Sequence, residues 1–544
     1  MRLPPHPAFD LLRFADDQPG AARRWRAGAL LAARHPGEAW QVVRALLAGK
    51  RVRARDRAAI LWGARHALHP PPFAAGKAEA VPGLRVATSA EILSEGAGPA
   101  AIVVLTAPGH RLVPGAAPAI AEVFAAEPGL EALYGDALVL GPGGKPLLPV
   151  LRPAFDPDYL LATDYVGPVV ALRRQALDRL GLDPSLPGAE AADLLLRLAA
   201  EGLGTIRHLP RLLSTWSPFE AAPPVTPEVW RRSRRALAER SLAGVGRVEE
   251  AGGVLVSRRT LPEPPRATVI VPTRDRVALL RTCLESLVAR TDWPEREIIV
   301  CDNDSREPET HAYFRELEQR GLARVLPCPG PFNFAAMNNR AASEASGRLL
   351  AFVNNDVEAI HPDWLARMAG EALRPEVGAV GAKLLDAEGR IQHGGIVLGA
   401  GGLVTHAHRH FPGDAPGYLH RLRATHRVSA VTAACLVIEA EKFRAVGGFD
   451  AEAFAVDFND VDLCLRLDRA GYRNLIVPGA VLHHREAASR RWTPAAQERH
   501  AAEVARLRER WGEALAADPW YNPGFDPRSG AYLRLRDPIE GNPR

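Results

Sequence analysis

The sequence predicts an α/β protein built on a mainly parallel central sheet, and three observations support this. From residue 266 onward, short runs rich in β-branched residues alternate with helix-length segments whose apolar residues recur at helical spacing. Clusters of Asn, Asp and Thr follow several of these runs. The chain of 544 residues is 47% hydrophobic and 24% charged, a composition typical of packed globular domains, and its length predicts two or three of them.

A proline-rich stretch, LPEPPRA, divides the chain near its middle. Before it, an N-terminal region has helical periodicity, and a following segment alternates strand-like runs such as AAIVVLTA with helix-like ones. The predicted parts are a helical region 1–78, an α/β module 79–250, a linker 251–265, a second α/β domain 266–490, and a helical cap and tail 491–544.

The second domain has the clearest order of elements. Strands that alternate with helices of this length predict βαβ units, in which neighbouring strands are parallel and both faces of the sheet are covered. Ligands of such sheets bind beyond the carboxyl ends of the strands. The predicted elements are strand 267–272, helix 276–291, strand 297–304, helix 307–321, strand 324–328, helix 333–346 and strand 348–354.

Polar clusters lie at the carboxyl ends of three of these strands. Asn and Asp are favoured turn residues, so each cluster alone is equally well explained by turn chemistry. Three clusters at one edge of one sheet favour a binding site instead. They are Pro272, Thr273, Arg274 and Asp275 after the first strand, Asp302 to Asp304 after the second, and Asn354, Asn355 and Asp356 after the fourth.

The clusters indicate a nucleotide diphosphate together with its metal ion. The usual dinucleotide fingerprint and the P-loop are both missing from the sequence. An acidic residue at a strand end, such as Asp302, can accept hydrogen bonds from a base or a ribose. A carboxylate after the fourth strand, Asp356, can bind a hard divalent cation, Mg²⁺ or Mn²⁺, with diphosphate oxygens and water completing the shell.

The motifs of the second half resemble family 2 glycosyltransferases of the GT-A fold, especially rhamnosyltransferase-like enzymes of O-antigen or surface-polysaccharide biosynthesis. The resemblance covers residues 266 to 525, about half of the chain. It rests on VPTRDR, EIIVCDNDS, FNFAAMNNRAA, LAFVNNDVE, GGFDAEAFAVDFNDVDLCLRL and VPGAVLHHREAASRR, which occur in the family's order.

The resemblance implies a role for each matching position. Asp302 matches the nucleotide-base aspartate, and Asn354, Asn355 and Asp356 match the D-x-D element, in which only Asp356 is a carboxylate. His483 matches a histidine that completes the metal shell, with the adjacent His484 as an alternative. The implied donor-side residues are Pro272, Thr273, Arg274, Asp275, Asp302, Asn333, Asn338, Arg340, Asn354 and Asn355, and the acceptor-side residues are His393, Asn459 and Asp462.

Asp460 matches the family's catalytic base. Its alternative role is that of an acid favoured by the dipole at a helix N-terminus. Asp462 lies in the same turn and could take that structural role, with Arg466 one turn away as a partner.

These roles imply an inverting, metal-dependent enzyme. It moves a hexosyl or deoxyhexosyl group from a nucleotide-diphosphate donor to a hydroxyl of a glycan or lipid-linked glycan. The alternative is a noncatalytic glycan-binding or scaffold protein of a polysaccharide assembly complex. The net charge of +5 gives little support for nucleic-acid binding, and the sequence has neither a signal-peptide pattern nor a long apolar run. We therefore expect a cytoplasmic protein with peripheral contact at the inner face of the membrane.

The first half of the chain repeats part of the second. Thr106, Ala107 and Pro108 fall near the Asn-Asn-Asp positions, and Ala191 falls where Asp460 stands. HLPRLLSTW aligned with IVPGAVLHH puts Thr215 at His483 and Trp216 at His484. The positions assigned to chemistry are lost together, while no match is found for the first two strands. Residues 79–250 are therefore predicted to be a truncated, noncatalytic GT-A-like module.

Overall fold

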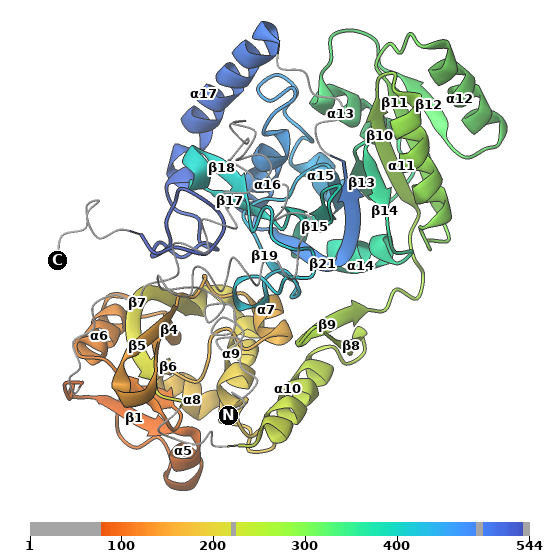
Figure 1. The fold of residues 1–544 in the computed structure, drawn as a ribbon. Helices are drawn as coiled ribbons and strands as arrows, with labels where there is room; N and C mark the ends of the chain where they lie inside the picture. The colour runs from red at the N-terminus through yellow and green to blue at the C-terminus, as the bar shows by residue number, and fades with distance from the viewer. Residues whose placement is uncertain (1–77, 219–224, 486–492, 537–544) are drawn as a thin grey trace, which may run out of the picture.

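The computed structural model describes residues 78–218, 225–485 and 493–536. The predicted helical region 1–78 therefore lies, apart from its last residue, outside the described residues. Two α/β modules, each built around its own sheet, are joined by a short β-hairpin (Figure 1). None of the helices in the described ranges is long and apolar enough to cross a bilayer.

The C-terminal module confirms the predicted βαβ order. Its first four strands lie side by side and parallel, in the order β12-β11-β10-β13. The polar clusters after β10, β11 and β13 therefore meet at one edge, as predicted. These elements are β10 (Ala267–Thr273), α11 (Val277–Ala289), β11 (Arg296–Asp302), α12 (Pro308–Gln319), β12 (Arg324–Pro327), α13 (Phe334–Glu344) and β13 (Leu349–Val353).

The rest of this sheet is mixed, because β20 runs antiparallel to both of its neighbours. The order continues from β13 as β20-β15-β21-β14. The remaining elements are β14 (Val357–Ala359), α14 (Trp364–Ala372), β15 (Val377–Leu385), β16 (Ile391–His393), β17 (Ile396–Leu398), β18 (Val404–His406), β19 (His426–Arg427), β20 (Cys435–Glu439), α15 (Ala440–Ala445), α16 (Asn459–Arg469), β21 (Arg473–His484) and α17 (Pro494–Ala516).

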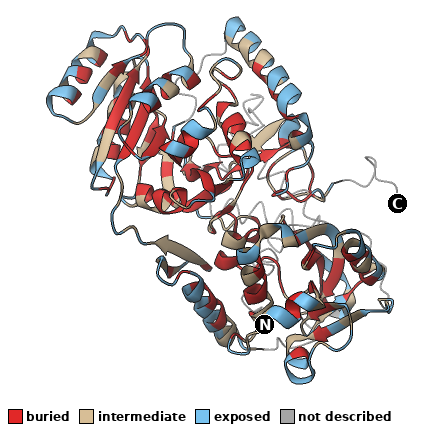
Figure 2. Cartoon of the chain, turned by 180° about the vertical axis from the view of Figure 1, so that it is seen from behind, coloured by how far each residue is buried: buried red, intermediate tan, exposed pale blue. Residues whose placement is uncertain are grey.

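The burial of strand β13 shows that both faces of the sheet are covered. Its five residues, LLAFV, are all buried. Successive side chains of a strand point to opposite faces. Ala351 and Val353 accordingly pack in one hydrophobic cluster, and Leu350 and Phe352 in the other. Figure 2 shows these buried central strands between helices with exposed outer faces. A continuous apolar run is the expected pattern for such a strand.

The N-terminal module has the same strand arrangement. Its order β1-β2-β6-β4-β7-β3 reproduces β10-β13-β20-β15-β21-β14, with each pair parallel or antiparallel as in the other module. Its elements are β1 (Leu84–Thr88), α5 (Ser89–Glu95), β2 (Ile102–Thr106), β3 (His110–Leu112), α6 (Ala116–Ala126), β4 (Ala132–Leu140), β5 (Pro146–Val150), α7 (Pro157–Ala162), β6 (Val170–Arg173), α8 (Arg174–Leu180), α9 (Glu190–Glu201), β7 (Ile206–Trp216) and α10 (Pro227–Ser241).

The repeat is truncated, but not where the sequence comparison put the gap. Strand β1 takes the place of β10, the first strand of the C-terminal sheet. Among the described residues, β11, β12 and the two-residue β19 are the strands of the C-terminal sheet without a counterpart in the N-terminal sheet. The N-terminal module therefore lacks the two strands at the outer edge of the fold.

The linker prediction is wrong in its first half. Residues 246–259 form a hairpin of β8 (Gly246–Ala251) and β9 (Val254–Arg259), so the predicted linker 251–265 begins inside it. Gly252 and Gly253 have φ values of 61° and 83°, a conformation that glycine adopts at little cost. Two consecutive glycines between the segments RVEEA and VLVSRR are a typical hairpin signal.

Helix α7 holds the two modules together. Asp158 pairs with Arg374 at 2.7 Å and with Arg473 at 3.1 Å, and both arginines belong to the C-terminal module. The hydroxyl of Tyr159 donates to the carbonyl oxygen of Leu419 at 2.5 Å. These contacts are buried or nearly so, and they join segments far apart in sequence.

We expect Tyr159→Phe to lower the free energy of unfolding by about 1 kcal/mol, because a buried carbonyl loses its donor while packing is kept. Urea titrations of the full chain measure the change. Tyr472→Phe is the matched control, since the Tyr472 hydroxyl makes no hydrogen bond to the described residues. Equal losses in the two variants would mean that the Tyr159 hydroxyl contributes nothing specific to the junction.

Candidate active site

Asp356 lies in the tight turn between β13 and β14, next to His484 at the end of β21. Its Oδ1 atom is 3.2 Å from His484 Nε2. Both side chains are buried, and Asp356 Oδ1 makes no hydrogen bond within the described residues. The backbone fixes the pair, because Val357 is directly opposite His484 and the Arg485 amide donates to the Asp356 carbonyl at 3.0 Å.

The neighbouring His483 does not face Asp356. It lies opposite Glu358 in the strand pairing and is half-buried. Adjacent residues of a strand point to opposite faces, so only one of the two histidines can face the turn. His484, which the sequence left as the alternative to His483, is the histidine within reach of Asp356.

Asp460 occupies the first turn of α16 and is held by backbone amides. Its Oδ2 accepts from the Ala433 amide at 3.0 Å, and its Oδ1 from the Val461 amide at 2.8 Å. Burial raises the pKa of this carboxyl, and these hydrogen bonds, with one from Thr432, oppose that effect. A carboxyl with a raised pKa binds a proton more readily than an ordinary aspartate does.

The loop before β20 brings Asp460 and the Asn-Asn-Asp turn together. Ala433 donates to Asp460, and the next residue, Ala434, accepts from the Asn354 amide at 3.0 Å. The turn is also joined to the end of β10, because Asn355 Nδ2 donates to Thr273 Oγ1 at 2.9 Å. Sequence reasoning missed residues 432–434, since two alanines and a threonine carry no chemical signal of a site.

Asp462, predicted on the acceptor side, has a structural role instead. Its side chain is 0% exposed. One oxygen pairs with Arg466 at 2.8 Å, and the other accepts from Arg510 and Trp511, each at 2.9 Å. This arrangement confirms the alternative in which Asp462 pairs with Arg466 one turn away.

The other two predicted acceptor-side residues are also buried. His393 is 0% exposed, its Nδ1 lies 2.7 Å from His406 Nδ1, and its Nε2 is 3.4 Å from the Thr432 amide. Burial lowers the pKa of His393 well below its ordinary value, and His406 and His484 add to this. Asn459 closes its own turn by donating to the Val456 carbonyl. Both residues therefore support the site rather than line it.

At the edge formed by the ends of β10 and β11, Asp302 is the predicted donor-side carboxylate with the fewest hydrogen bonds. It is half-buried, and its Oδ1 accepts from the Ser305 amide at 3.0 Å. Its Oδ2 accepts no hydrogen bond from the described residues. Asp275 instead braces the loop after β11, accepting from the Arg306 and Glu307 amides at 2.6 and 2.9 Å. Pro272 is buried in the strand, and Arg274 is exposed beside it.

Helix α13 contributes less than predicted. Asn333 is its N-cap, accepting from the Ala336 amide at 2.8 Å and donating to the Ala451 carbonyl. Asn338 is fully buried and donates to the Phe334 carbonyl of its own helix. Arg340 is exposed, with Glu344 3.7 Å away. Of the three, Arg340 is the one free to reach a ligand from solvent.

The residues present supply too few ligands to bind a divalent cation alone. A bound diphosphate has to provide the others. Among the described residues, no group of three or more His, Cys, Asp or Glu side chains could bind a metal. Asp356 supplies a buried carboxylate oxygen with no hydrogen bond, and His484 supplies a ring nitrogen. A hard cation held by one or two protein groups takes its other ligands from phosphate oxygens and water.

The N-terminal module lacks the carboxylate of the turn. The Ser217 amide donates to the Gly109 carbonyl at 2.8 Å, as the Arg485 amide donates to the Asp356 carbonyl. This pairing puts Gly109 at the Asp356 position, one or two residues from the match made by sequence. A glycine there has no side chain to bind a cation.

The positions of Asp460 and His484 hold other residues in the N-terminal module, as the sequence comparison indicated. Trp216 lies opposite His110 of β3, as His484 lies opposite Val357 of β14. Ala191 is the second residue of α9, as Asp460 is the second residue of α16. The positions of Asp356, Asp460 and His484 have therefore all lost their chemistry in the N-terminal module.

A network of one buried aspartate and two arginines is present on the corresponding helix of each module. In each, a fully buried aspartate pairs with the arginine four residues on and with an arginine of the following helix. The first arginine also donates to two carbonyls before the helix. The residues are Asp193, Arg197 and Arg240 in the N-terminal module and Asp462, Arg466 and Arg510 in the C-terminal module.

Residues 268–395 match the family model described as glycosyl transferase family 2. The uncharacterized protein y4gI of Sinorhizobium fredii is 37% identical over 428 residues, which are 76% of this chain and 47% of that one. The O-antigen biosynthesis protein RfbC of Myxococcus xanthus is 36% identical over 436 residues, 78% of this chain and 33% of that one. The chain thus spans half or less of these two relatives.

A shorter relative is the N-acetylglucosaminyl-diphospho-decaprenol L-rhamnosyltransferase of Mycobacterium tuberculosis. It is 27% identical over 231 residues, which cover 38% of this chain and 72% of that enzyme. The family match includes Asp302 and Asp356 and ends before Asp460 and His484.

Proposed function

Because residues 268–395 match the family 2 glycosyltransferase model, we propose that the C-terminal module transfers a sugar from a nucleotide-diphosphate donor to a hydroxyl of a glycan or lipid-linked glycan. Two relatives, an O-antigen biosynthesis protein and a rhamnosyltransferase, support a role in surface-polysaccharide assembly. The proposed donor edge is formed by β10, β11 and β13, with Asp302 toward the nucleoside.

One observation carries the proposal. Ala433 and Ala434 bind Asp460 and the Asn354 amide respectively, so a carboxyl with a raised pKa lies beside the turn that presents Asp356. A transferase needs a base on the acceptor side of the reacting carbon and a charge-stabilising group on the phosphate side. The two carboxylates meet those needs from separate elements.

In the proposed reaction, Asp460 takes the proton of the acceptor hydroxyl as its oxygen attacks the anomeric carbon and the bond to the diphosphate breaks. Asp460 acts only when ionised, so transfer slows as the pH falls through its raised pKa. Because the proposal assigns one carboxylate as base and none of the described ones as nucleophile, the substitution is direct and inverts the anomeric configuration. A product that NMR finds to have kept the donor configuration would contradict this step.

Asp356 and His484 are the residues proposed to hold a divalent cation. Bound there, Mg²⁺ or Mn²⁺ would supply Lewis-acid stabilisation of the negative charge that develops on the departing diphosphate. The buried carboxylate oxygen without a hydrogen bond supports this assignment.

We expect His484→Gln to raise the Mn²⁺ concentration for half-maximal transfer at least tenfold. His483→Gln is the matched control and should leave it unchanged, because His483 faces away from Asp356. Electron paramagnetic resonance of free Mn²⁺, measured with nucleoside diphosphate present, reports binding without relying on activity. Equal effects of the two substitutions would remove His484 from the proposed site.

A donor screen tests the activity itself. The purified 544-residue chain is given each of a panel of sugar nucleotides, a glycan or lipid-linked acceptor, and Mn²⁺ or Mg²⁺. We expect acceptor-dependent release of nucleoside diphosphate from at least one donor. If no donor reacts and glycan still binds, the noncatalytic scaffold alternative is favoured instead.

A further inference from the structure

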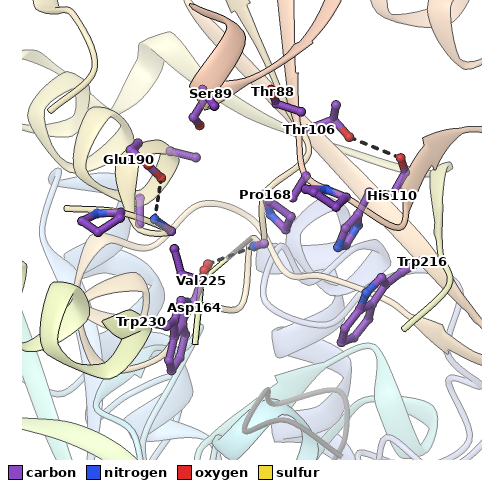
Figure 3. Close-up of a pocket in the computed structure, with 18 of the residues that line it drawn as sticks. Thr88, Ser89, Thr106, His110, Asp164, Pro168, Glu190, Trp216, Val225 and Trp230 are labelled. Atoms are coloured by element: carbon purple, nitrogen blue, oxygen red, sulfur yellow. Dashed lines mark hydrogen bonds between the residues drawn. The ribbon is translucent and has the colours of Figure 1, made fainter. Parts of the chain in front are cut away.

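The N-terminal module contains a cavity of about 420 Å³ at the edge of its sheet (Figure 3). Its lining includes Thr106 to Pro108 after β2, Ala191 of α9 and Trp216 of β7. These elements correspond to the Asn354–Asp356 turn, the Asp460 helix and the His484 strand of the other module. The cavity therefore lies where the other module has its candidate active site.

Aromatic side chains line this cavity from two elements. Trp216 ends β7 and stacks on His110, with ring centroids 5.3 Å apart and planes 7° from parallel. Trp230 comes from α10 and lies against Gly188. Figure 3 shows Trp216 and His110 on one side of the view and Trp230 on the other. Half-buried tryptophans offer large apolar faces to a ligand.

Two carboxylates supply polar contacts. Asp164 Oδ1 accepts from the Gly167 amide at 3.0 Å, and Glu190 Oε2 accepts from the Gly188 amide at 2.9 Å. These bonds fix the orientation of both carboxylates, and both residues line the cavity. Burial raises the pKa of Glu190. Oriented carboxylate oxygens beside apolar walls are suited to ligand hydroxyl groups, which donate to them.

The described lining of the cavity favours a neutral ligand over a nucleotide diphosphate. It contains the carboxylates of Asp164 and Glu190 and, among the described residues, no lysine or arginine. Arg152 and Arg234, whose charges act on Asp164, are buried and donate to backbone carbonyls. The module also lacks counterparts of β11, which carries Asp302, and of β12. A neutral ligand with several hydroxyl donors and an apolar C–H face fits these walls, and that is the chemistry of a sugar ring.

We propose that this cavity is a noncatalytic binding site for a neutral saccharide. Aromatic faces pack against the C–H groups of the sugar ring, and Asp164 and Glu190 accept hydrogen bonds from its hydroxyls. Binding needs no metal ion, because Gly109 and Trp216 stand where the other module has Asp356 and His484. Where the proposed function also holds, the bound sugar is part of the glycan acceptor.

Fluorine NMR of the full chain labelled with 5-fluorotryptophan tests the site. Trp216→Phe and Trp230→Phe each remove one fluorine signal and so assign the two signals. Methyl α-L-rhamnoside, methyl α-D-mannoside, N-acetylglucosamine and neutral oligosaccharides are titrated in EDTA, together with UDP. At least one saccharide should move both signals saturably, and UDP should move neither. If no saccharide moves either tryptophan signal, or if UDP moves one of them, the proposal is wrong.

Variants give a second measure. Trp230→Ala, followed through the Trp216 signal, and Asp164→Asn combined with Glu190→Gln should each weaken saccharide binding at least tenfold. Leu147→Ala, an exposed apolar change in the same module, is the control and should bind like wild type. Asp460→Asn should also bind like wild type, so the test stands even if the proposed activity fails. Unchanged affinity in both cavity variants contradicts the site.

Discussion

Asp460→Asn is expected to lower the rate of transfer at saturating substrates by about 10²–10⁴-fold, the range that a positioned general base contributes. Asparagine keeps the size of the side chain but cannot take the proton of the acceptor. The donor site lies on other elements, so the affinity for the donor should be unchanged. Steady-state release of nucleoside diphosphate gives the rate, and calorimetry gives the donor affinity.

The matched control is Asp468→Asn, at the exposed end of the same helix. It should keep nearly full activity, because the Asp468 side chain pairs with Arg427 and not with the site. If both substitutions reduced transfer equally, the effect would come from the helix rather than from a base at Asp460.

The same variant has an expected signature in stability. Because the folded-state pKa of Asp460 is raised by burial, its contribution to folding is present at low pH and is lost as the pH rises through that pKa. In Asp460→Asn the side chain does not ionise, so the variant does not lose this stability as the pH rises. Its free energy of unfolding should therefore increase relative to wild type as the pH rises from acidic toward neutral, which urea titrations at several pH values measure.

Asp462→Ala is expected to lower the free energy of unfolding by about 3–5 kcal/mol, since it leaves Arg466 and Arg510 without their buried carboxylate. Asp193→Ala removes the equivalent group of the N-terminal module and should cost a similar amount. Urea unfolding of both proteins measures the losses. If Asp462→Ala lowered the free energy of unfolding only slightly and the folded variant were inactive, the prediction that Asp462 contacts the acceptor would be favoured instead.

The sequence predicted the parallel half of the C-terminal sheet well, because alternating strands and amphipathic helices are local patterns. It also identified the paired loss of Asp356 and Asp460 equivalents, since a within-chain comparison needs no coordinates. It placed the gap in the repeat wrongly, because β1 has no sequence likeness to β10 and is matched by its neighbours in the sheet alone.

Other parts of the site depend on contacts that no local pattern encodes. The choice between His483 and His484 is decided by strand register, which flips the face of every side chain when it shifts by one residue. The burial of His393 and Asn459 follows from packing between distant segments. The Ala433–Ala434 link was invisible for a different reason, because it is made by backbone groups.

The central claim is one active centre per chain, in the C-terminal module, with a copy that has lost its chemistry. Calorimetric titration with Mn²⁺ and the nucleoside diphosphate identified by the donor screen tests it most directly, in wild type and in Asp356→Ala. We predict one site per chain in wild type and at least a tenfold loss of affinity in Asp356→Ala. Two sites per chain, or a single site of unchanged affinity in Asp356→Ala, would contradict the account.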